Sequence, residues 1–203
     1  MSVAVLYSYR RCPYAMRARM ALKYSGIKVD VREIALKNKP AEMLKVSPKG
    51  TVPVLVLQDG HVIEQSLEIM HWALQQNDVD GWLAADSTLT QQLIAENDGS
   101  FKQALDKYKY AICFPEQSTE IYRLQGEAFL RKLELRFSQS QFLLQNQLSL
   151  ADIAIFPFIR QFAAVDAAWF DAADYPRLKA WLRVLLKSAL FESVMVKQPT
   201  YIE

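Results

Sequence analysis

Residues 3–17 read VAVLYSYRRCPYAMR, and this stretch decides the fold of the N-terminal half. Its apolar start predicts a strand, and Pro13 suits the first position of a helix, where its missing N–H would have no intrahelical partner. Cys12 is therefore expected at the N-terminus of that helix. Unpaired backbone N–H groups and the helix dipole favour thiolate over thiol there. Because position 15 is alanine, there is no Cys-x-x-Cys pair, and the stretch predicts a reactive monothiol.

The residues around Cys12 support the same prediction. Positive side chains stabilise a thiolate, which is the nucleophilic form of cysteine. The nearby basic residues are Arg10, Arg11 and Arg17. The other cysteine, Cys113, has apolar neighbours, and we expect it to be buried in the core. A lone thiolate forms a mixed disulfide with a small thiol, and a second molecule of that thiol then releases it.

Strand and helix signals alternate over the first 76 residues in the order βαβαββα. We expect strands at residues 3–8, 29–34, 54–57 and 61–63, and helices at residues 13–25, 40–46 and 66–76. Asp59-Gly60 is typical of a hairpin turn between the last two strands. Gly26 is placed to end the first helix in a left-handed conformation. The order predicts one compact α/β unit.

Turn-forming residues at positions 77–81 (NDVDG) break this pattern. They predict a linker at about residues 78–85, between an N-terminal domain at 1–77 and a C-terminal domain at 86–203. After the linker the periodicity predicts helices only, at residues 87–110, 118–137, 149–165 and 175–191. Ser149 and Asp152 have the spacing of a capping box at the start of the third of these. The second half is therefore predicted to be all-helical.

Composition limits the class of protein. Hydrophobic residues make up 51% of the 203 residues, which is enough for a substantial core. Lys plus Arg is 24 and Asp plus Glu is 22, so the net charge of +2 gives no reason to expect nucleic acid or a membrane as partner. No apolar run reaches the roughly 18 residues that cross a bilayer, and no signal peptide is visible, so we expect a cytoplasmic protein. His61 and His71 are too few for a metal site, and we expect both at the surface.

Two further segments fit a peptide-like ligand near the thiol. In TVPV at residues 51–54, a cis Val52-Pro53 bond would turn the backbone of Val52 outward to pair with an extended peptide. The alternative is a trans proline that enters an edge strand. Ser66 at a helix N-terminus can bind a carboxylate, or it can be a plain N-cap. Lys39 can pair with a second carboxylate or remain solvated.

Together these motifs resemble the cytosolic glutathione transferases over essentially the whole chain, and above all their cysteine-type, omega-like branch. The resemblance implies a thioredoxin-like N-terminal domain followed by an all-helical domain, with Cys12 as the catalytic residue. The positions that match the family's glutathione-binding motifs are Leu36, Lys39, Val52, Pro53, Gln65 and Ser66. Gln65 stands where the family usually has an acidic residue, and its amide can still donate to a carboxylate.

The resemblance also implies an activity. It points to glutathione-dependent thiol transfer or reduction, for example of dehydroascorbate, by a cytoplasmic homodimer with a role in detoxification. Glutathione would be the co-substrate and no metal would take part. Tyr108 and Trp169, with Phe101 and Leu105, would line the pocket for the second substrate, although aromatic residues at helical spacing are also typical of a core. Two alternatives stay open: a non-enzymatic regulator of the stringent-starvation type that binds a protein partner, and a glutaredoxin-like monothiol oxidoreductase.

Overall fold

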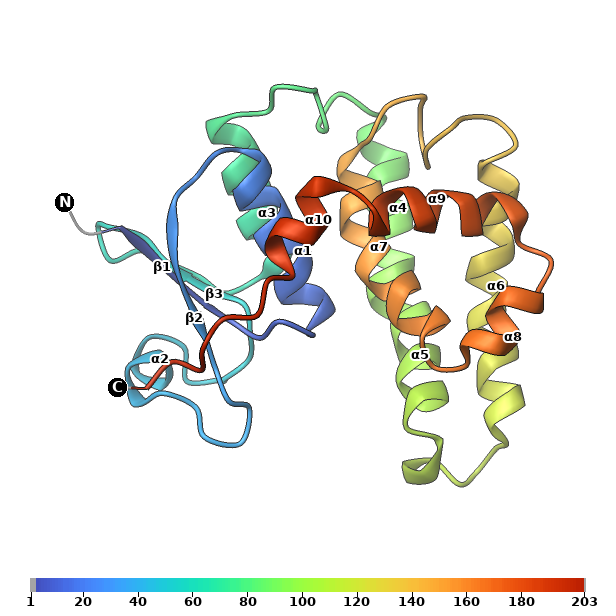
Figure 1. The fold of residues 1–203 in the computed structure, drawn as a ribbon, viewed down its shortest axis with the longest axis horizontal. Coiled ribbons are helices and arrows are strands. Elements are labelled where there is room, and N and C mark those ends of the chain that lie inside the picture. Colours follow the sequence, from blue (N-terminus) through green and yellow to red (C-terminus); the bar gives the residue numbers. More distant parts are fainter. Residues whose placement is uncertain (1–2, 203) are drawn as a thin grey trace. The chain divides into compact units, whose positions relative to one another are not determined.

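The structure is a computed structural model that describes residues 3–202 (Figure 1). Contacts within the chain divide it into two compact units. The N-terminal unit contains the described residues up to 79 together with residues 187–202, and the helical unit contains residues 80–186. The end of the chain is thus grouped with its beginning. The predicted domain limits, which follow the order of elements along the sequence, stay a prediction.

A four-stranded mixed sheet organises the N-terminal unit. Its strands lie in the order β2-β1-β3-β4, with β1 parallel to β2 and antiparallel to β3, and with β3 antiparallel to β4. The strands are β1 (Ala4–Ser8), β2 (Val29–Glu33), β3 (Val54–Val56) and β4 (Val62–Ile63). Gly60, with a φ of 87°, forms the turn between β3 and β4, as predicted from Asp59-Gly60. The predicted order βαβαββα is confirmed.

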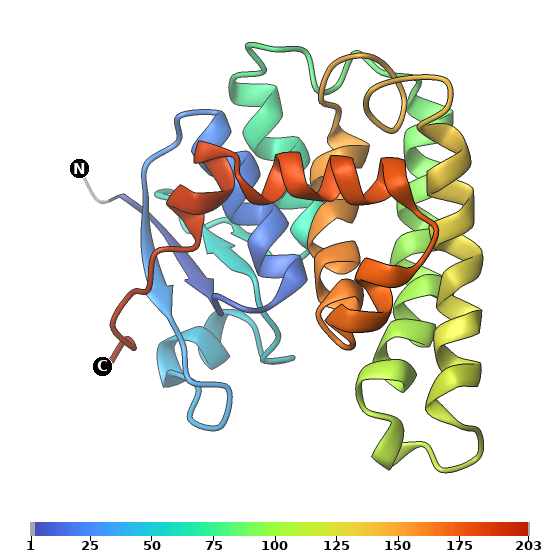
Figure 2. The same cartoon turned by 45° about the vertical axis from the view of Figure 1, so that its right-hand side comes forward.

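Helices cover both faces of this sheet. The helices of the unit are α1 (Pro13–Tyr24), α2 (Ala41–Val46), α3 (Ser66–Gln76) and α10 (Ala189–Val194). Helices α1 and α3 pack against each other, and α10 packs on α1 (Figure 2). Tyr7 of β1 packs into a core cluster with Ile34, Val54 and Met43, of which Met43 comes from α2.

The C-terminal segment returns to the edge of this sheet. Figures 1 and 2 show it running beside β2 after α10. Thr200 forms a parallel bridge with Glu33, and the N–H of Tyr201 donates to the carbonyl oxygen of Glu33 at 2.7 Å. The ring of Tyr201 packs against the core around Tyr7. The exposed edge of β2 is partly covered in this way.

The helical unit contains the remaining helices. They are α4 (Ser87–Glu96), α5 (Lys102–Lys109), α6 (Thr119–Arg136), α7 (Leu150–Ala163), α8 (Ala167–Ala172) and α9 (Pro176–Leu186). The helix predicted at residues 87–110 is interrupted by a π-helical turn at Asn97–Phe101. This turn directs Phe101 into the core, where its ring centroid lies 4.9 Å from that of Phe129 and 5.5 Å from that of Phe162. The helix predicted at 175–191 ends at Leu186, before the short α10.

Helix α7 forms the centre of the helical unit, since nearly all of its side chains are buried. The capping box predicted at its start is present. Asp152, which is fully buried, accepts hydrogen bonds from the N–H and hydroxyl of Ser149, from the N–H of Leu143 and from the indole of Trp181. Within residues 3–202, no helix combines the length and the apolar character that crossing a membrane requires.

Candidate functional site

The thiol of Cys12 lies at the N-terminus of α1, as predicted. Cys12 is the N-cap residue, with extended backbone angles, and Pro13 is the first residue of the helix. The N–H of Cys12 donates to the carbonyl oxygen of Tyr9 at 3.0 Å, which closes a turn between β1 and α1. The side chain is half-buried and makes no capping bond to the helix. The sulfur is therefore held at the positive end of the helix without being used in the cap.

The Val52-Pro53 peptide bond brings a second segment to this sulfur. The bond is cis, which is the form implied by the resemblance rather than the trans alternative. Cys12 Sγ lies 3.7 Å from the carbonyl oxygen of Val52, a distance at which a thiol donates a weak hydrogen bond. Two residues that are forty positions apart in the sequence thus meet at one point. Pro53 is buried beside β3, and Val52 is half-buried.

Ser66 lies at the start of α3, where it contacts a residue of α1. Gln65 is the N-cap of α3 and Ser66 is its first residue, so the alternative of Ser66 as a plain N-cap is not what the structure shows. The Ser66 hydroxyl, in a side chain only 5% exposed, accepts a hydrogen bond from Arg17 Nε at 3.0 Å. Arg17 is also buried, and its guanidinium lies over the ring of Tyr14 at 5.1 Å from the centroid. The serine is thereby fixed at the positive end of a helix dipole.

Gln65, Leu36 and Lys39 remain more open to solvent than Ser66. Gln65 and Leu36 are exposed, and Lys39 is half-buried. The Lys39 side chain lies over Gly50, since a Cβ built on Gly50 would come within 3.3 Å of Lys39 Nζ. The structure shows the positions of these side chains, and their role in binding glutathione stays a prediction.

Glu64, one position before Gln65, has a structural partner. Its carboxylate accepts a hydrogen bond from the buried hydroxyl of Ser47 and lies 3.7 Å from Lys49 Nζ. These contacts tie the loop before Val52-Pro53 to the segment that leads into α3. The carboxylate is therefore engaged beside the predicted binding residues.

The arginines near Cys12 have more specific partners than the sequence indicated. Arg17 contacts Ser66, and Arg11 donates to the hydroxyl of Tyr9. The N–H of Arg10 donates to Glu33. Arg19 was not singled out by the sequence, although it is only 7% exposed and binds the backbone before Cys12. A signal was available: an arginine seven residues after Cys12, between alanine and methionine on the buried face of a helix, requires internal partners.

In the helical unit, one of the residues singled out from the sequence is exposed and others are buried. The prediction that Cys113 is buried is wrong, because Cys113 is exposed in a short 3₁₀ turn at Ala111–Cys113. The turn follows the end of α5, so the apolar neighbours do not reach the core. Phe101 and Leu105 are buried.

Tyr108 and Trp169 meet at one ring in the helical unit. Tyr108 is 3% exposed and Trp169 is half-buried. Both pack against Phe162, with ring centroids 5.0 Å and 6.2 Å from it. Burial raises the pKa of the Tyr108 hydroxyl, and the carboxylate of Asp166 adds to this effect. Whether Tyr108 and Trp169 line a substrate pocket stays a prediction.

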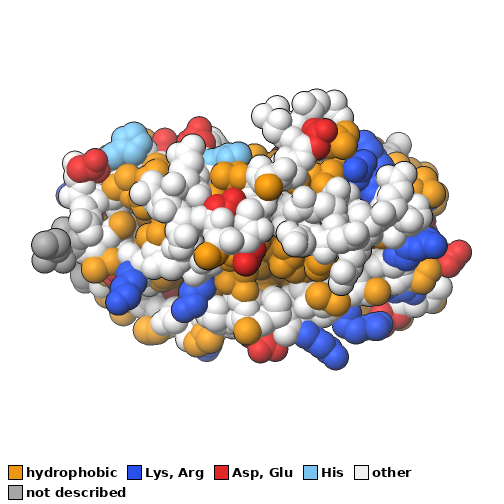
Figure 3. Space-filling view, turned by 90° about the horizontal axis from the view of Figure 1, so that it is seen from above, with side chains coloured by type: hydrophobic (Ala, Val, Ile, Leu, Met, Phe, Trp, Pro, Cys, Tyr) orange, Lys and Arg blue, Asp and Glu red, His pale blue; other side chains and the backbone are white. Residues whose placement is uncertain are grey.

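The described residues contain no cluster of three or more metal-binding side chains of the histidine, cysteine, aspartate or glutamate type. His61 and His71 are exposed, and Figure 3 shows histidine side chains, in pale blue, at the surface. The candidate site consequently consists of a thiol, a cis-proline backbone and a helix N-terminus. Such a set can pair with an extended peptide, bind its carboxylate and exchange its disulfide.

Comparison with known proteins identifies the family. Residues 6–87 match the family model of the glutathione S-transferase N-terminal domain, and residues 116–183 match that of the glutathione S-transferase C-terminal domain. Rat glutathione S-transferase omega-1 is 29% identical over 206 residues, which cover 97% of this chain and 82% of the rat protein.

Solved structures show the same fold. Glutathione transferase Omega 3C from Trametes versicolor superposes with a TM-score of 0.80 at 20% identity, covering 100% of this chain and 93% of that one. Glutathione transferase URE2P6 from Phanerochaete chrysosporium, solved with oxidized glutathione, also has a TM-score of 0.80, at 19% identity and 94% coverage of both chains. The two family models and the relatives along the full chain show that this protein belongs to the glutathione S-transferase family, in its omega-like branch.

Proposed function

We propose that this glutathione transferase catalyses glutathione-dependent thiol transfer through Cys12. The observation that carries the proposal is the position of the sulfur, at the N-terminus of α1 and 3.7 Å from the carbonyl oxygen of Val52. A serine or tyrosine hydroxyl can hydrogen-bond the thiolate of glutathione without reacting with it. A cysteine at this position reacts with disulfides itself, so exchange is favoured over conjugation.

The reaction proceeds in two exchange steps. The Cys12 thiolate attacks the glutathionyl sulfur of a mixed disulfide, RS–SG. The Cys12–SG bond forms, the RS–SG bond breaks, and RS⁻ leaves and takes up a proton. The thiolate of a second glutathione then attacks the glutathionyl sulfur on Cys12. Glutathione disulfide leaves and the Cys12 thiolate is restored, so each turnover converts one mixed disulfide and one glutathione into one thiol and one glutathione disulfide.

Glutathione is held, in this proposal, by the segments around the thiol. The backbone of Val52 before Pro53 pairs with the cysteinyl part, and Gln65 and Ser66 bind the γ-glutamyl carboxylate. Leu36 and Lys39 flank the tripeptide on the side of the loop before α2. Support comes from the cis Val52-Pro53 bond, from the position of Ser66 at a helix N-terminus and from the oxidized glutathione in the URE2P6 structure.

The second substrate is proposed to be a small disulfide, a glutathione conjugate or dehydroascorbate, which binds near Tyr108 and Trp169. We also propose that the protein acts as a cytoplasmic homodimer in detoxification. These proposals rest on membership of the family.

Intact-mass spectrometry tests the two steps directly. We expect glutathione disulfide to add one glutathione to the protein, at Cys12 by peptide mapping, and reduced glutathione to remove it. A Cys113→Ser variant serves as the control, because it removes the second free thiol, which is exposed. Modification of Cys113 alone would contradict the proposal.

Glutathione binding itself is tested at Ser66. We expect Ser66→Ala to weaken the affinity for glutathione by about tenfold to a hundredfold, because a hydrogen bond to a charged group contributes about 1.5–3 kcal/mol. Calorimetric titration well below the melting temperature measures this effect apart from stability. Ser87→Ala, at the first residue of α4, is the matched control and should bind normally.

Binding to immobilised glutathione distinguishes a protein that keeps the glutathione site from a partner-binding regulator on this fold that has lost it. A regulator that has lost the site would pass through immobilised glutathione. If Ser66→Ala binds glutathione as tightly as the unaltered protein, the assignment of Ser66 is wrong.

A further inference from the structure

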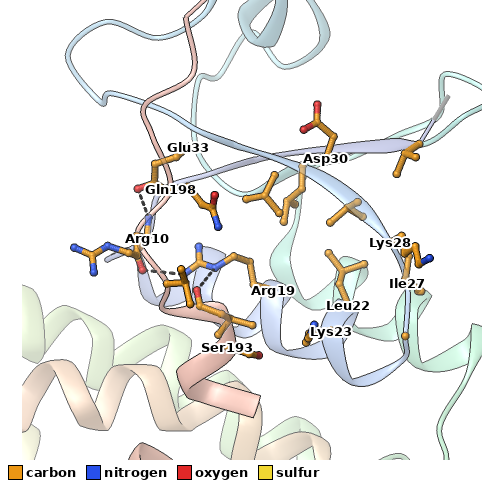
Figure 4. Close-up of a pocket in the computed structure, with 17 residues that line it drawn as sticks. Arg10, Arg19, Leu22, Lys23, Ile27, Lys28, Asp30, Glu33, Ser193 and Gln198 are labelled. Carbon is orange, nitrogen blue, oxygen red and sulfur yellow. Dashed lines mark hydrogen bonds between the residues drawn. The ribbon is translucent and has the colours of Figure 1, made fainter. Parts of the chain in front are cut away.

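Arg19 is a buried arginine of α1 whose side chain donates hydrogen bonds to two separate backbone segments, the one before Cys12 and the end of α10. The side chain is 7% exposed. Its Nη2 donates to the carbonyl oxygen of Arg10 at 2.8 Å, and its Nη1 donates to that of Tyr9 at 3.4 Å and to the hydroxyl of Ser8. Its Nε donates to the carbonyl oxygen of Val194, at the end of α10, at 3.2 Å (Figure 4). One guanidinium thus joins the segment before Cys12 to the C-terminal part of the chain.

The segment that Arg19 binds is the turn that carries the thiol. The carbonyl oxygen of Tyr9, which accepts from Arg19, also accepts from the N–H of Cys12 at 3.0 Å. On the other side of the turn, the N–H of Arg10 donates to Glu33 Oε1 at 2.7 Å. Side chains from α1 and β2 therefore hold the turn from two directions.

The same residues hold residues 194–201, which we call the C-terminal strap. Arg10 Nη1 lies 3.5 Å from the carbonyl oxygen of Met195, and the backbone carbonyl oxygen of Glu33 accepts from the N–H of Tyr201. At the end of the strap, Tyr201 makes a cation–π contact with Arg32, whose guanidinium lies 4.5 Å from the centroid of the ring. Arg10, Arg19 and Glu33 consequently join the turn at Tyr9–Cys12 and the strap into one hydrogen-bonded assembly.

The charge of Arg19 is coupled to this assembly. Burial lowers the pKa of Arg19 to about 10, while the charges of Glu33 and Cys12 act in the opposite direction.

We propose that Arg19 is a positioning residue for Cys12, and that the C-terminal strap is an outer support of the thiol site. Fixing this turn to the strap requires several donors in one side chain. The forked guanidinium provides them, since three backbone carbonyls and a hydroxyl accept from it. The catalytic consequence rests on the proposed function of Cys12. The structural consequence, a fixed turn at Tyr9–Cys12, does not.

The surroundings of Arg19 make it suitable for substitution. Arg19, Glu33 and Val194 line a cavity of about 640 Å³ in the N-terminal unit, which Figure 4 shows. None of Cys12, Val52 and Ser66 lines it. A lysine or methionine at position 19 therefore has room without overpacking the core.

The kinetic test compares Arg19→Lys, which keeps the charge and loses the fork, with the unaltered protein. We expect kcat for a glutathione mixed disulfide to fall about tenfold or more, with KM for glutathione within about twofold, because the proposed glutathione contacts are not part of the assembly. Arg19→Met should lower kcat further. An unchanged kcat in Arg19→Lys, or a parallel loss through unfolding alone, would overturn the proposal.

Amide hydrogen exchange gives a readout that does not depend on activity. In Arg19→Lys and in Glu33→Ala we expect the Cys12 and Arg10 amides to exchange about tenfold faster or more than in the unaltered protein. A chain shortened after Ser193, which removes the whole strap including the carbonyl groups of Val194 and Met195, should show the same change with Arg19 intact. If these amides exchange at the original rate in all three variants, the strap and Arg19 do not fix the turn.

Arg136→Lys is the matched control. Arg136 also donates from a helix to a backbone carbonyl, that of Leu143 at 2.9 Å, but it belongs to the helical unit. It should leave kcat and the exchange of Cys12 unchanged. If the unaltered protein has no thiol-transferase turnover, the proposed function fails, and the exchange measurements still decide the role of Arg19.

Discussion

Cys12→Ser is expected to lower thiol-transferase turnover by about a thousandfold or more while glutathione continues to bind. Removing the nucleophile from a covalent mechanism typically has an effect of this size. A serine hydroxyl cannot form the mixed disulfide, so neither exchange step takes place. The contacts proposed for Val52, Gln65 and Ser66 remain, and affinity should stay within about twofold.

The measurement is turnover of a glutathione mixed disulfide in a Cys113→Ser background, with glutathione affinity measured in parallel. Conjugation of glutathione to an aryl halide should rise in Cys12→Ser, because the hydroxyl can hydrogen-bond the glutathione thiolate without reacting. Turnover equal to that of the parent protein would exclude Cys12 as the nucleophile.

Asp152→Ala is expected to cause a large loss of stability. The carboxylate accepts from four donors, and Leu143 N–H, Ser149 N–H and Trp181 Nε1 bond to it inside the helical unit. Each buried donor left without its partner costs about 1–3 kcal/mol. We expect a loss of at least about 3 kcal/mol in the free energy of unfolding.

Thermal unfolding measures this loss as a fall in Tm of about 6–12 °C, since 1 kcal/mol corresponds to about 2–4 °C for a chain of this size. Asp86→Ala is the control: Asp86 is an exposed N-cap that accepts from the N–H of Leu89, and its loss should cost about 1 kcal/mol. Equal shifts in Tm for the two variants would mean that the buried hydrogen bonds of Asp152 stabilise the protein no more than an ordinary exposed N-cap does.

Local signals in the sequence predicted most of the fold. The helix at Ser66–Gln76 was predicted with the observed ends, and Gly26, with a φ of 71°, ends α1 as expected. These features depend on neighbours in the chain, through capping, glycine conformation and periodicity. The position of Cys12 at a helix start belongs to the same class. Its chemistry stays a prediction.

The features that the sequence did not indicate depend on residues far apart in the chain. The partner of Arg17 is Ser66, forty-nine positions away, and Thr200 pairs with Glu33 across an even longer separation. Periodicity indicates that a polar residue lies on a helix or that a short tail ends the sequence, but it does not indicate which distant residue either one contacts. Phe101, in the π-helical turn, likewise packs against Phe129 and Phe162, which lie far from it in the chain.

The exposed position of Cys113 has a practical consequence for every experiment on Cys12. Each molecule carries a second thiol on a surface turn of the helical unit, outside the hydrogen-bonded assembly of α1. When both cysteines compete for a limiting alkylating reagent, the ratio of the two labelled peptides is independent of protein concentration and reagent decay. Cys113 is thus an internal standard against which the alkylation rate of Cys12 can be compared within a single sample.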